Sequence, residues 1–146
     1  MSALSARPLH WSASYIGMPF RELGRTRGGA DCWGLTCIVY AEQLAIDLPP
    51  YLGLYTSVEE RAEISAIVDG AIAEAGTWAI VDHPQEFDIA VIRQGKYGSH
   101  VGILISPRQM LHMAEKASAR IDDFTQPRWA SRLTNIYRHR GARQRL

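Results

Sequence analysis

The chain has 146 residues, of which 47% are hydrophobic and 21% are charged, and its formal net charge is +1. This length fits one domain with a core of its own, and the composition excludes wholesale disorder. A nearly neutral chain gives no reason to expect nucleic acid as a partner.

The N-terminal stretch MSALSARPLHWSASY does not have the pattern of a secretory signal, which needs a basic start and a continuous apolar core. No apolar run approaches the roughly 18 residues that a membrane span requires. We therefore expect one domain over residues 1–146, made in a cytoplasm and without a membrane span.

Residues 10–31 mix aromatics, glycines and a proline, which indicates a short helix or turn followed by a loop. A buried helix is predicted next, with Asp31 as its N-cap. The run from Trp33 to Ala41 contains one polar side chain, as in a helix buried all round. The segment DLPPYLG (47–53) should end this helix, because proline cannot continue it.

A second, amphipathic helix is predicted from Ser57 to about Ala75. Its apolar side chains recur at helical spacing and would form one stripe against the core: Ile64, Ile67, Val68, Ala71, Ile72 and Ala75.

Four strands are then predicted, at residues 87–93, 100–105, 110–114 and 135–139. Helices followed by an antiparallel meander indicate an α+β domain.

Cys32 stands where the glycine-rich loop becomes the buried helix. A helix N-terminus favours the thiolate, which is the nucleophilic form of cysteine. The alternative is a small buried hydrophobe, the usual fate of a free cysteine, and Cys37 fits that description. Five residues apart on a helix, the two thiols would point about 140° apart, so no disulfide is expected.

Two histidines lie in the predicted strands, His100 at the start of one and His112 in the middle of the next. A three-residue loop, 106–108, would place His112 opposite Gly102 and diagonal to His100, whereas a two- or four-residue loop would turn it to the other face. His100 could then take a proton from Cys32, and His112 could orient the His100 ring. Each histidine alone is also compatible with a structural role.

Together these segments resemble the NlpC-type cell-wall peptidases, a papain-like cysteine peptidase family. The resemblance lies in YIGMPF (15–20), DCWGL (31–35), HVGIL (100–104) and the later His112. It implies a papain-like core, in which the helix that bears the nucleophile packs on an antiparallel sheet, with the helix at 57–75 as an insertion.

By this resemblance Cys32 is the nucleophile, His100 the general base and then acid, and His112 the orienting residue. Tyr15 and Asp31 match positions that shape the substrate region, and Trp33 replaces a common serine there. The implied substrate is a peptidoglycan stem peptide, often cut after D-glutamate, and the implied chemistry uses no metal or cofactor.

The inserted helix, the one-domain chain and the missing export signal resemble the phage-tail branch of the family. That branch implies assembly into a phage tail tip after synthesis in the bacterial cytoplasm, with other tail-tip proteins as partners.

Two alternatives stay open from the sequence. The first is a tail-assembly component that acts mainly by binding, because the bulk of Trp33 could fill part of the site. The second is zinc held by Cys32, His100 and His112, since three mixed ligands can leave a fourth position open.

Overall fold

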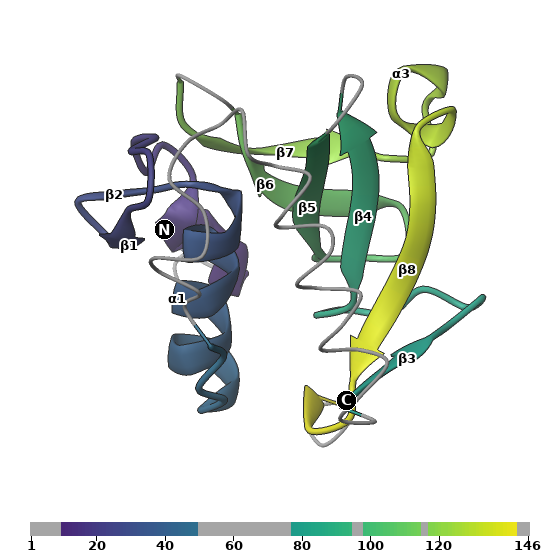
Figure 1. Cartoon of the computed structure of the whole chain (residues 1–146), viewed down its shortest axis with the longest axis horizontal. Coiled ribbons are helices and arrows are strands. Elements are labelled where there is room, and N and C mark those ends of the chain that lie inside the picture. Colours follow the sequence, from purple (N-terminus) through teal and green to yellow (C-terminus); the bar gives the residue numbers. More distant parts are fainter. Residues whose placement is uncertain (1–9, 50–76, 95–97, 115–116, 143–146) are drawn as a thin grey trace, which may run out of the picture.

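The computed structural model describes residues 10–49, 77–94, 98–114 and 117–142. Helix α1 (Cys32–Leu44) lies against strands β5 and β6 of a six-stranded sheet (Figure 1). In chain order the other described elements are η2 (a 3-10 helix, Trp11–Tyr15), β1 (Arg25–Thr26), β2 (Gly29–Ala30), β3 (Trp78–Ile80), β4 (Ile89–Gln94), β5 (Gly98–Leu104), β6 (Gln109–Met113), β7 (Ala119–Asp123), the short helix α3 (Pro127–Ala130) and β8 (Leu133–His139).

Helix α1 begins where the sequence predicted. The Asp31 carboxylate caps it by accepting the backbone N–H of Gly34 at 2.7 Å. Most of its side chains are buried, as expected for a helix that is apolar all round. The helix ends at Leu44, before the prolines are reached, because Ala45 adopts a left-handed conformation with φ of 55°.

The six-stranded sheet has the order β3-β8-β4-β5-β6-β7, and every pair is antiparallel. The four predicted strands are present as β4, β5, β6 and β8. They do not form one meander, however, because β8 returns to pair with β4 on the side away from β5. Such a long-range pairing leaves no local pattern in the sequence.

The sequence did not predict β3, β7 or α3, nor the two-residue strands β1 and β2 in the stretch expected to be a loop. β3 is only three residues long, and β7 reads ARIDD, with three charged residues out of five. Both depart from the apolar alternation by which a strand is recognised, and they are held mainly by pairing with β8 and β6.

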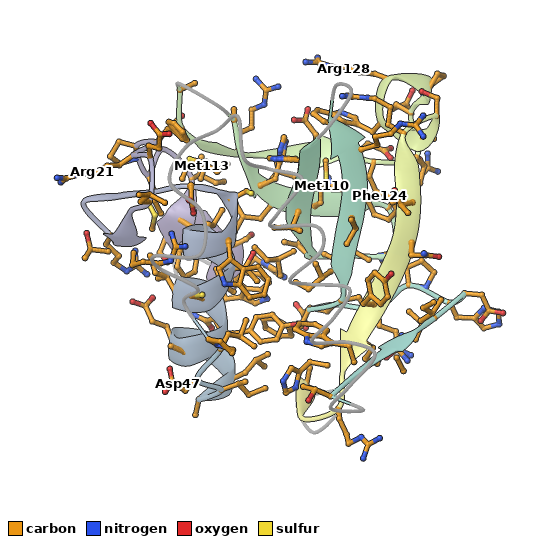
Figure 2. All side chains as sticks on the ribbon, in the orientation of Figure 1. Arg21, Asp47, Met110, Met113, Phe124 and Arg128 are labelled. Carbon is orange, nitrogen blue, oxygen red and sulfur yellow. The ribbon has the colours of Figure 1, made fainter. Side chains whose placement is uncertain are left out.

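Two apolar clusters cover the two faces of the sheet. The first joins α1 to Val101, Ile103, Leu111 and Met113, and the second contains Ala90, Ile92, Leu104, Met110, Phe124 and Trp129. Figure 2 shows Met113 beside α1, and Met110 and Phe124 farther from that helix. The α+β prediction, with a helix packed on an antiparallel sheet, is therefore confirmed.

The helix predicted at 57–75 lies outside the described residues. Within the part of the chain that is described, no helix has the length and apolar character needed to span a membrane.

Candidate active site

Cys32 is the first residue of α1 and is half-buried at the edge of the first apolar cluster. The Asp31 cap beside it also accepts a hydrogen bond from Arg25 at 2.8 Å, so the start of the helix is held by two contacts. The N-terminal end of a helix attracts negative charge, and this place favours a thiolate. The location is the one that the sequence predicted.

Cys37, the second thiol of α1, has a different environment. Burial raises the pKa of Cys37 to about 12, so it stays protonated at neutral pH. Both thiols are unbridged. The structural role predicted for Cys37 fits this inert state.

His100 and His112 form a buried hydrogen-bonded pair across β5 and β6. The register sets Gly102 opposite His112, and the backbone bond from Ile105 to Gln109 closes the three-residue loop. His100 Nε2 and His112 Nδ1 are 2.8 Å apart. The hairpin geometry predicted from the sequence is thus confirmed.

The pair continues to a carboxylate that the sequence did not single out. Asp122 on β7 accepts a hydrogen bond from His112 Nε2 at 2.7 Å, and Arg120 Nε donates to the same oxygen at 2.9 Å. No motif marks Asp122, and the strand that carries it was not predicted. Its place beside His112 follows only from the pairing of β6 with β7.

The charge states of His112 and Asp122 follow from burial and hydrogen bonding. Burial lowers the pKa of His112 below its ordinary value, although Asp122 acts in the opposite direction. Burial of Asp122 acts to raise its pKa, but the hydrogen bonds from His112 and Arg120 outweigh this and hold it below its usual range. At neutral pH the site therefore contains a neutral His112 beside an ionised Asp122.

Trp129 of α3 covers the two histidines on the second face of the sheet. Its ring centroid lies 5.0 Å from that of His112 and 6.4 Å from that of His100. Trp129 is 8% exposed, and the guanidinium groups of Arg128 and Arg132 each lie 5.0 Å from its ring centroid. The aromatic ring excludes water from one side of the histidine pair.

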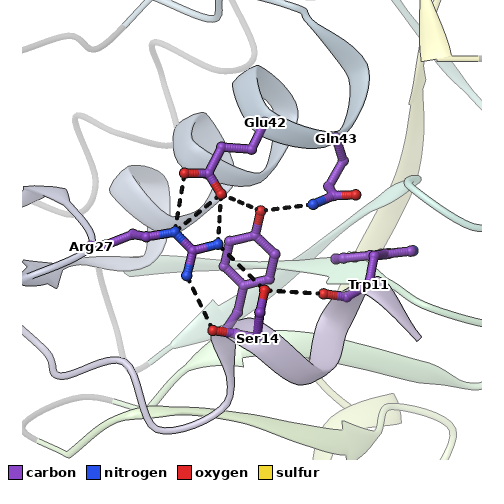
Figure 3. Close-up of polar contacts among 6 residues, drawn as sticks. Trp11, Ser14, Arg27, Glu42 and Gln43 are labelled. Carbon is purple, nitrogen blue, oxygen red and sulfur yellow. Dashed lines mark hydrogen bonds and ion pairs between the residues drawn. The ribbon is translucent and has the colours of Figure 1, made fainter. Parts of the chain in front are cut away.

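Tyr15, predicted to shape the substrate region, is buried in a polar network between η2 and α1 (Figure 3). Its hydroxyl donates to Glu42 at 2.6 Å and accepts from Gln43 at 3.1 Å. Arg27 lies over the ring and also bonds Glu42, as the dashed lines show. Burial, with the hydrogen bond to Glu42 next, raises the pKa of Tyr15, so the phenol stays protonated.

Trp33 is 3% exposed and packs in the first apolar cluster. Its indole N–H donates to the carbonyl oxygen of Pro49 at 2.8 Å. Trp33, the residue after the predicted nucleophile, is therefore part of the hydrophobic core.

The structure brings His100 and His112 together, and it places Tyr15, Asp31 and Trp33 on or beside α1. Within the described ranges, no group of three His, Cys, Asp or Glu side chains is positioned to hold a metal ion. The arrangement provides a thiol at a helix N-terminus and an oriented imidazole pair on the neighbouring sheet.

A model of the NlpC/P60 family matches residues 17–138. The chain belongs to the NlpC/P60 family. This confirms the resemblance carried by DCWGL and HVGIL, whereas the phage-tail branch of that resemblance stays a prediction.

A curated relative is the Escherichia coli K12 protein named murein DD-endopeptidase MepS/murein LD-carboxypeptidase. It is 26% identical over 135 residues, which cover 92% of this chain and 63% of the relative. The same protein from Escherichia coli O157:H7 matches equally. This chain therefore spans about 63% of the length of these curated relatives.

Solved structures show the same fold. An NlpC/P60 family protein from Bacillus cereus ATCC 10987 superposes with a TM-score of 0.62 at 21% identity, covering 88% of this chain and 37% of that one. The NlpC/p60 domain of the peptidoglycan hydrolase SagA gives a TM-score of 0.55 at 21% identity, covering 86% of this chain and 90% of that domain.

Proposed function

We propose that this chain is a cysteine peptidase that hydrolyses peptide bonds in the stem peptides of bacterial peptidoglycan. The observation that supports it best is the hydrogen-bonded His100–His112 pair, in a family fold whose helix begins at Cys32. The Escherichia coli relative is named for two activities on murein, which supports the substrate class.

In this proposal His100 accepts the thiol proton of Cys32, and the thiolate attacks the scissile carbonyl carbon. The backbone N–H of Cys32 can stabilise the oxyanion that forms. The C–N bond then breaks, His100 gives its proton to the leaving amine, and a thioester remains on Cys32. Water activated by His100 hydrolyses the thioester and restores the thiol.

Tyr15, Asp31 and Trp33 are proposed to shape the substrate region from within the fold. All three are buried, so they act by fixing the backbone around Cys32 and present little surface to a ligand. Asp31 holds the start of α1, while Trp33 and Tyr15 join the helix to Pro49 and to η2.

The decisive test is Cys32→Ala, assayed by chromatography and mass spectrometry of the fragments released from purified murein. Substrates containing DD cross-links, L,D-tetrapeptides and the bond after D-glutamate would locate the bond that is cut. We expect the variant to lose turnover by roughly 10⁴-fold or more, because no other group can form the thioester. Cys37→Ala is the control and should keep wild-type turnover. Murein cleavage by folded Cys32→Ala protein would refute the assignment.

A role in a phage or prophage tail tip, with other tail proteins as partners, stays a proposal of its own. It rests on the resemblance drawn from the sequence, whereas the curated relatives are named as murein enzymes. Co-purification of the chain with assembled tail particles would support it, and particles that lack the chain would count against it.

A binding-only role draws no support from the position of Trp33. That role was inferred from the bulk of Trp33 beside Cys32, but this side chain is 3% exposed and packs into the first apolar cluster.

A further inference from the structure

Side chains on three neighbouring strands form a hydrogen-bonded series. Its last member is the Asp122 carboxylate, which belongs to no motif found in the sequence. β5, β6 and β7 are neighbours in the sheet (Figure 1). They contain His100, His112 and Asp122, respectively. The two links between them measure 2.8 Å and 2.7 Å. The two links identify a partner for three ring nitrogens, so the positions of the protons can be derived in turn.

An ionised carboxylate only accepts hydrogen bonds, so His112 Nε2 must carry the proton in its link to Asp122. The neutral His112 ring then has a lone pair on Nδ1. That lone pair can only accept, and His100 Nε2 must therefore carry a proton too. Whenever the His100 ring is neutral, its lone pair is therefore on Nδ1, the nitrogen that is not in the link to His112.

We propose that Asp122 is a positioning residue for the thiol hydrolase reaction. By accepting the His112 N–H it selects the tautomer of His112, and through His112 it selects the tautomer of His100 that can take the thiol proton at Nδ1. This inference rests on the proposed function. Asp122 does not gain a proton at any step, since the proton passes from Cys32 Sγ to His100 Nδ1 and then to the leaving amine.

The surroundings make this carboxylate hard to replace by solvent. His112 is 1% exposed, and Trp129 stacks on His100 and meets His112 edge-on, so water has little access to the rings. Arg120 bonds the same Asp122 oxygen and so keeps the carboxylate charged and in place. Asp122 is the acceptor that keeps the proton of His112 on Nε2, and its removal would release that constraint.

β7 supplies a matched control. Asp123 is the next residue and its side chain points to the opposite face, where it pairs with Arg108 and bonds Thr125. Its bonded partners do not include either histidine. Asp122→Asn and Asp123→Asn thus make the same chemical change on adjacent residues, and only the first alters the hydrogen-bonded chain.

The test combines steady-state turnover of murein fragments with ¹⁵N NMR of histidine-labelled protein, the resonances being assigned with His100→Gln and His112→Gln. In wild type we expect both rings as the Nε2–H tautomer. In Asp122→Asn the amide can donate to His112 Nε2, so the Nδ1–H tautomer should appear, with kcat reduced by roughly 10²- to 10⁴-fold and KM little changed. Asp123→Asn should match wild type in both measurements, and Asp122→Glu should recover part of the lost kcat.

Several outcomes would overturn the inference. If His100 and His112 of the wild-type protein are Nδ1–H tautomers, the inference is wrong. This result needs no variant, so it holds even if Asp122→Asn fails to fold. Unchanged tautomers and kcat in folded Asp122→Asn, with turnover that still depends on Cys32, would overturn it while leaving the proposed function intact. Absence of turnover in wild type would overturn both, and the NMR spectra would still show whether Asp122 selects the tautomers.

Discussion

Cys32 and Cys37 lie five residues apart on one helix, yet the two thiols have different surroundings. Cys32 is at the start of α1, where the helix dipole favours an anion. Cys37 lies in the second turn, where burial is the largest influence on its pKa and raises it to about 12. Position along the helix, rather than residue type, thus distinguishes the environment of the predicted nucleophile from that of Cys37.

We expect iodoacetamide at pH 7 to alkylate Cys32 at least about 100-fold faster than Cys37, because with a pKa near 12 roughly one Cys37 in 10⁵ is a thiolate. Peptide mass spectrometry over a time course measures both rates in one sample. The Cys32→Ala protein provides the control, in which only slow labelling should remain. Equal rates for the two thiols would contradict the environment described for α1.

At the scale of elements, the first turn of α1 packs directly on the loop that precedes β1. A Cβ added to Gly34 would lie 2.0 Å from the carbonyl oxygen of Gly24, which is backbone and cannot swing aside. This contact, together with the Asp31 cap, fixes the turn that bears Cys32. The glycine of the DCWGL motif therefore has a packing role.

Gly34→Ala should lower the free energy of unfolding by about 1–3 kcal/mol, since the clash with Gly24 outweighs the better helix propensity of alanine. Urea titration followed by circular dichroism measures this change. Gly28→Ala is the matched control, and its free energy of unfolding should stay within about 0.5 kcal/mol of the wild-type value. The nearest atom to the added Cβ would be the Thr26 hydroxyl oxygen, at an ordinary contact distance of 3.5 Å. A Gly34→Ala protein more stable than wild type would show that the two backbones are not in such close contact.

Across the whole molecule, the sheet separates two cores and buries ionisable groups on both of its faces. His112 lies on the face covered by Trp129, and the ring of His139 packs against those of Tyr40 and Trp78. Burial lowers the pKa of both histidines. Hydrogen bonds from Arg27 lower the pKa of Glu42.

Stability should therefore fall as the pH drops from 7 to 5. Below about pH 6.5 His112 and His139 bind protons more readily in the unfolded chain than in the folded one, because folding lowers their pKa values. His112 alone can lower the free energy of unfolding by up to about 1.4 kcal/mol per pH unit. Below about pH 4.5 the contributions of Glu42 and Asp122 are lost as well, because their pKa values are lowered on folding. Urea unfolding at several pH values measures the slope.

His139→Gln serves as the control for this pH dependence. It removes a half-buried histidine whose pKa is lowered by burial and which lies outside the candidate site, so the slope between pH 7 and 5 should become shallower. Stability that is constant or rises on acidification would contradict the burial of these rings.

The local sequence was enough to predict the buried helix, its Asp31 cap and the register of the His100–His112 hairpin. Each of these depends on residues close together in the chain, where capping, periodicity and loop length decide the geometry. The roles of Cys32, Tyr15, Asp31 and Trp33 in substrate turnover stay predictions from the family resemblance.

Only the tertiary structure decided that β8 pairs with β4, that Trp129 covers the histidines and that Asp122 completes their hydrogen-bonded chain. The physical reason is the same in each case. These partners come from separate strands and from a short helix whose own residues carry no strong local preference. They meet only because the sheet brings distant segments side by side, so neither periodicity nor a motif in the chain could have located them.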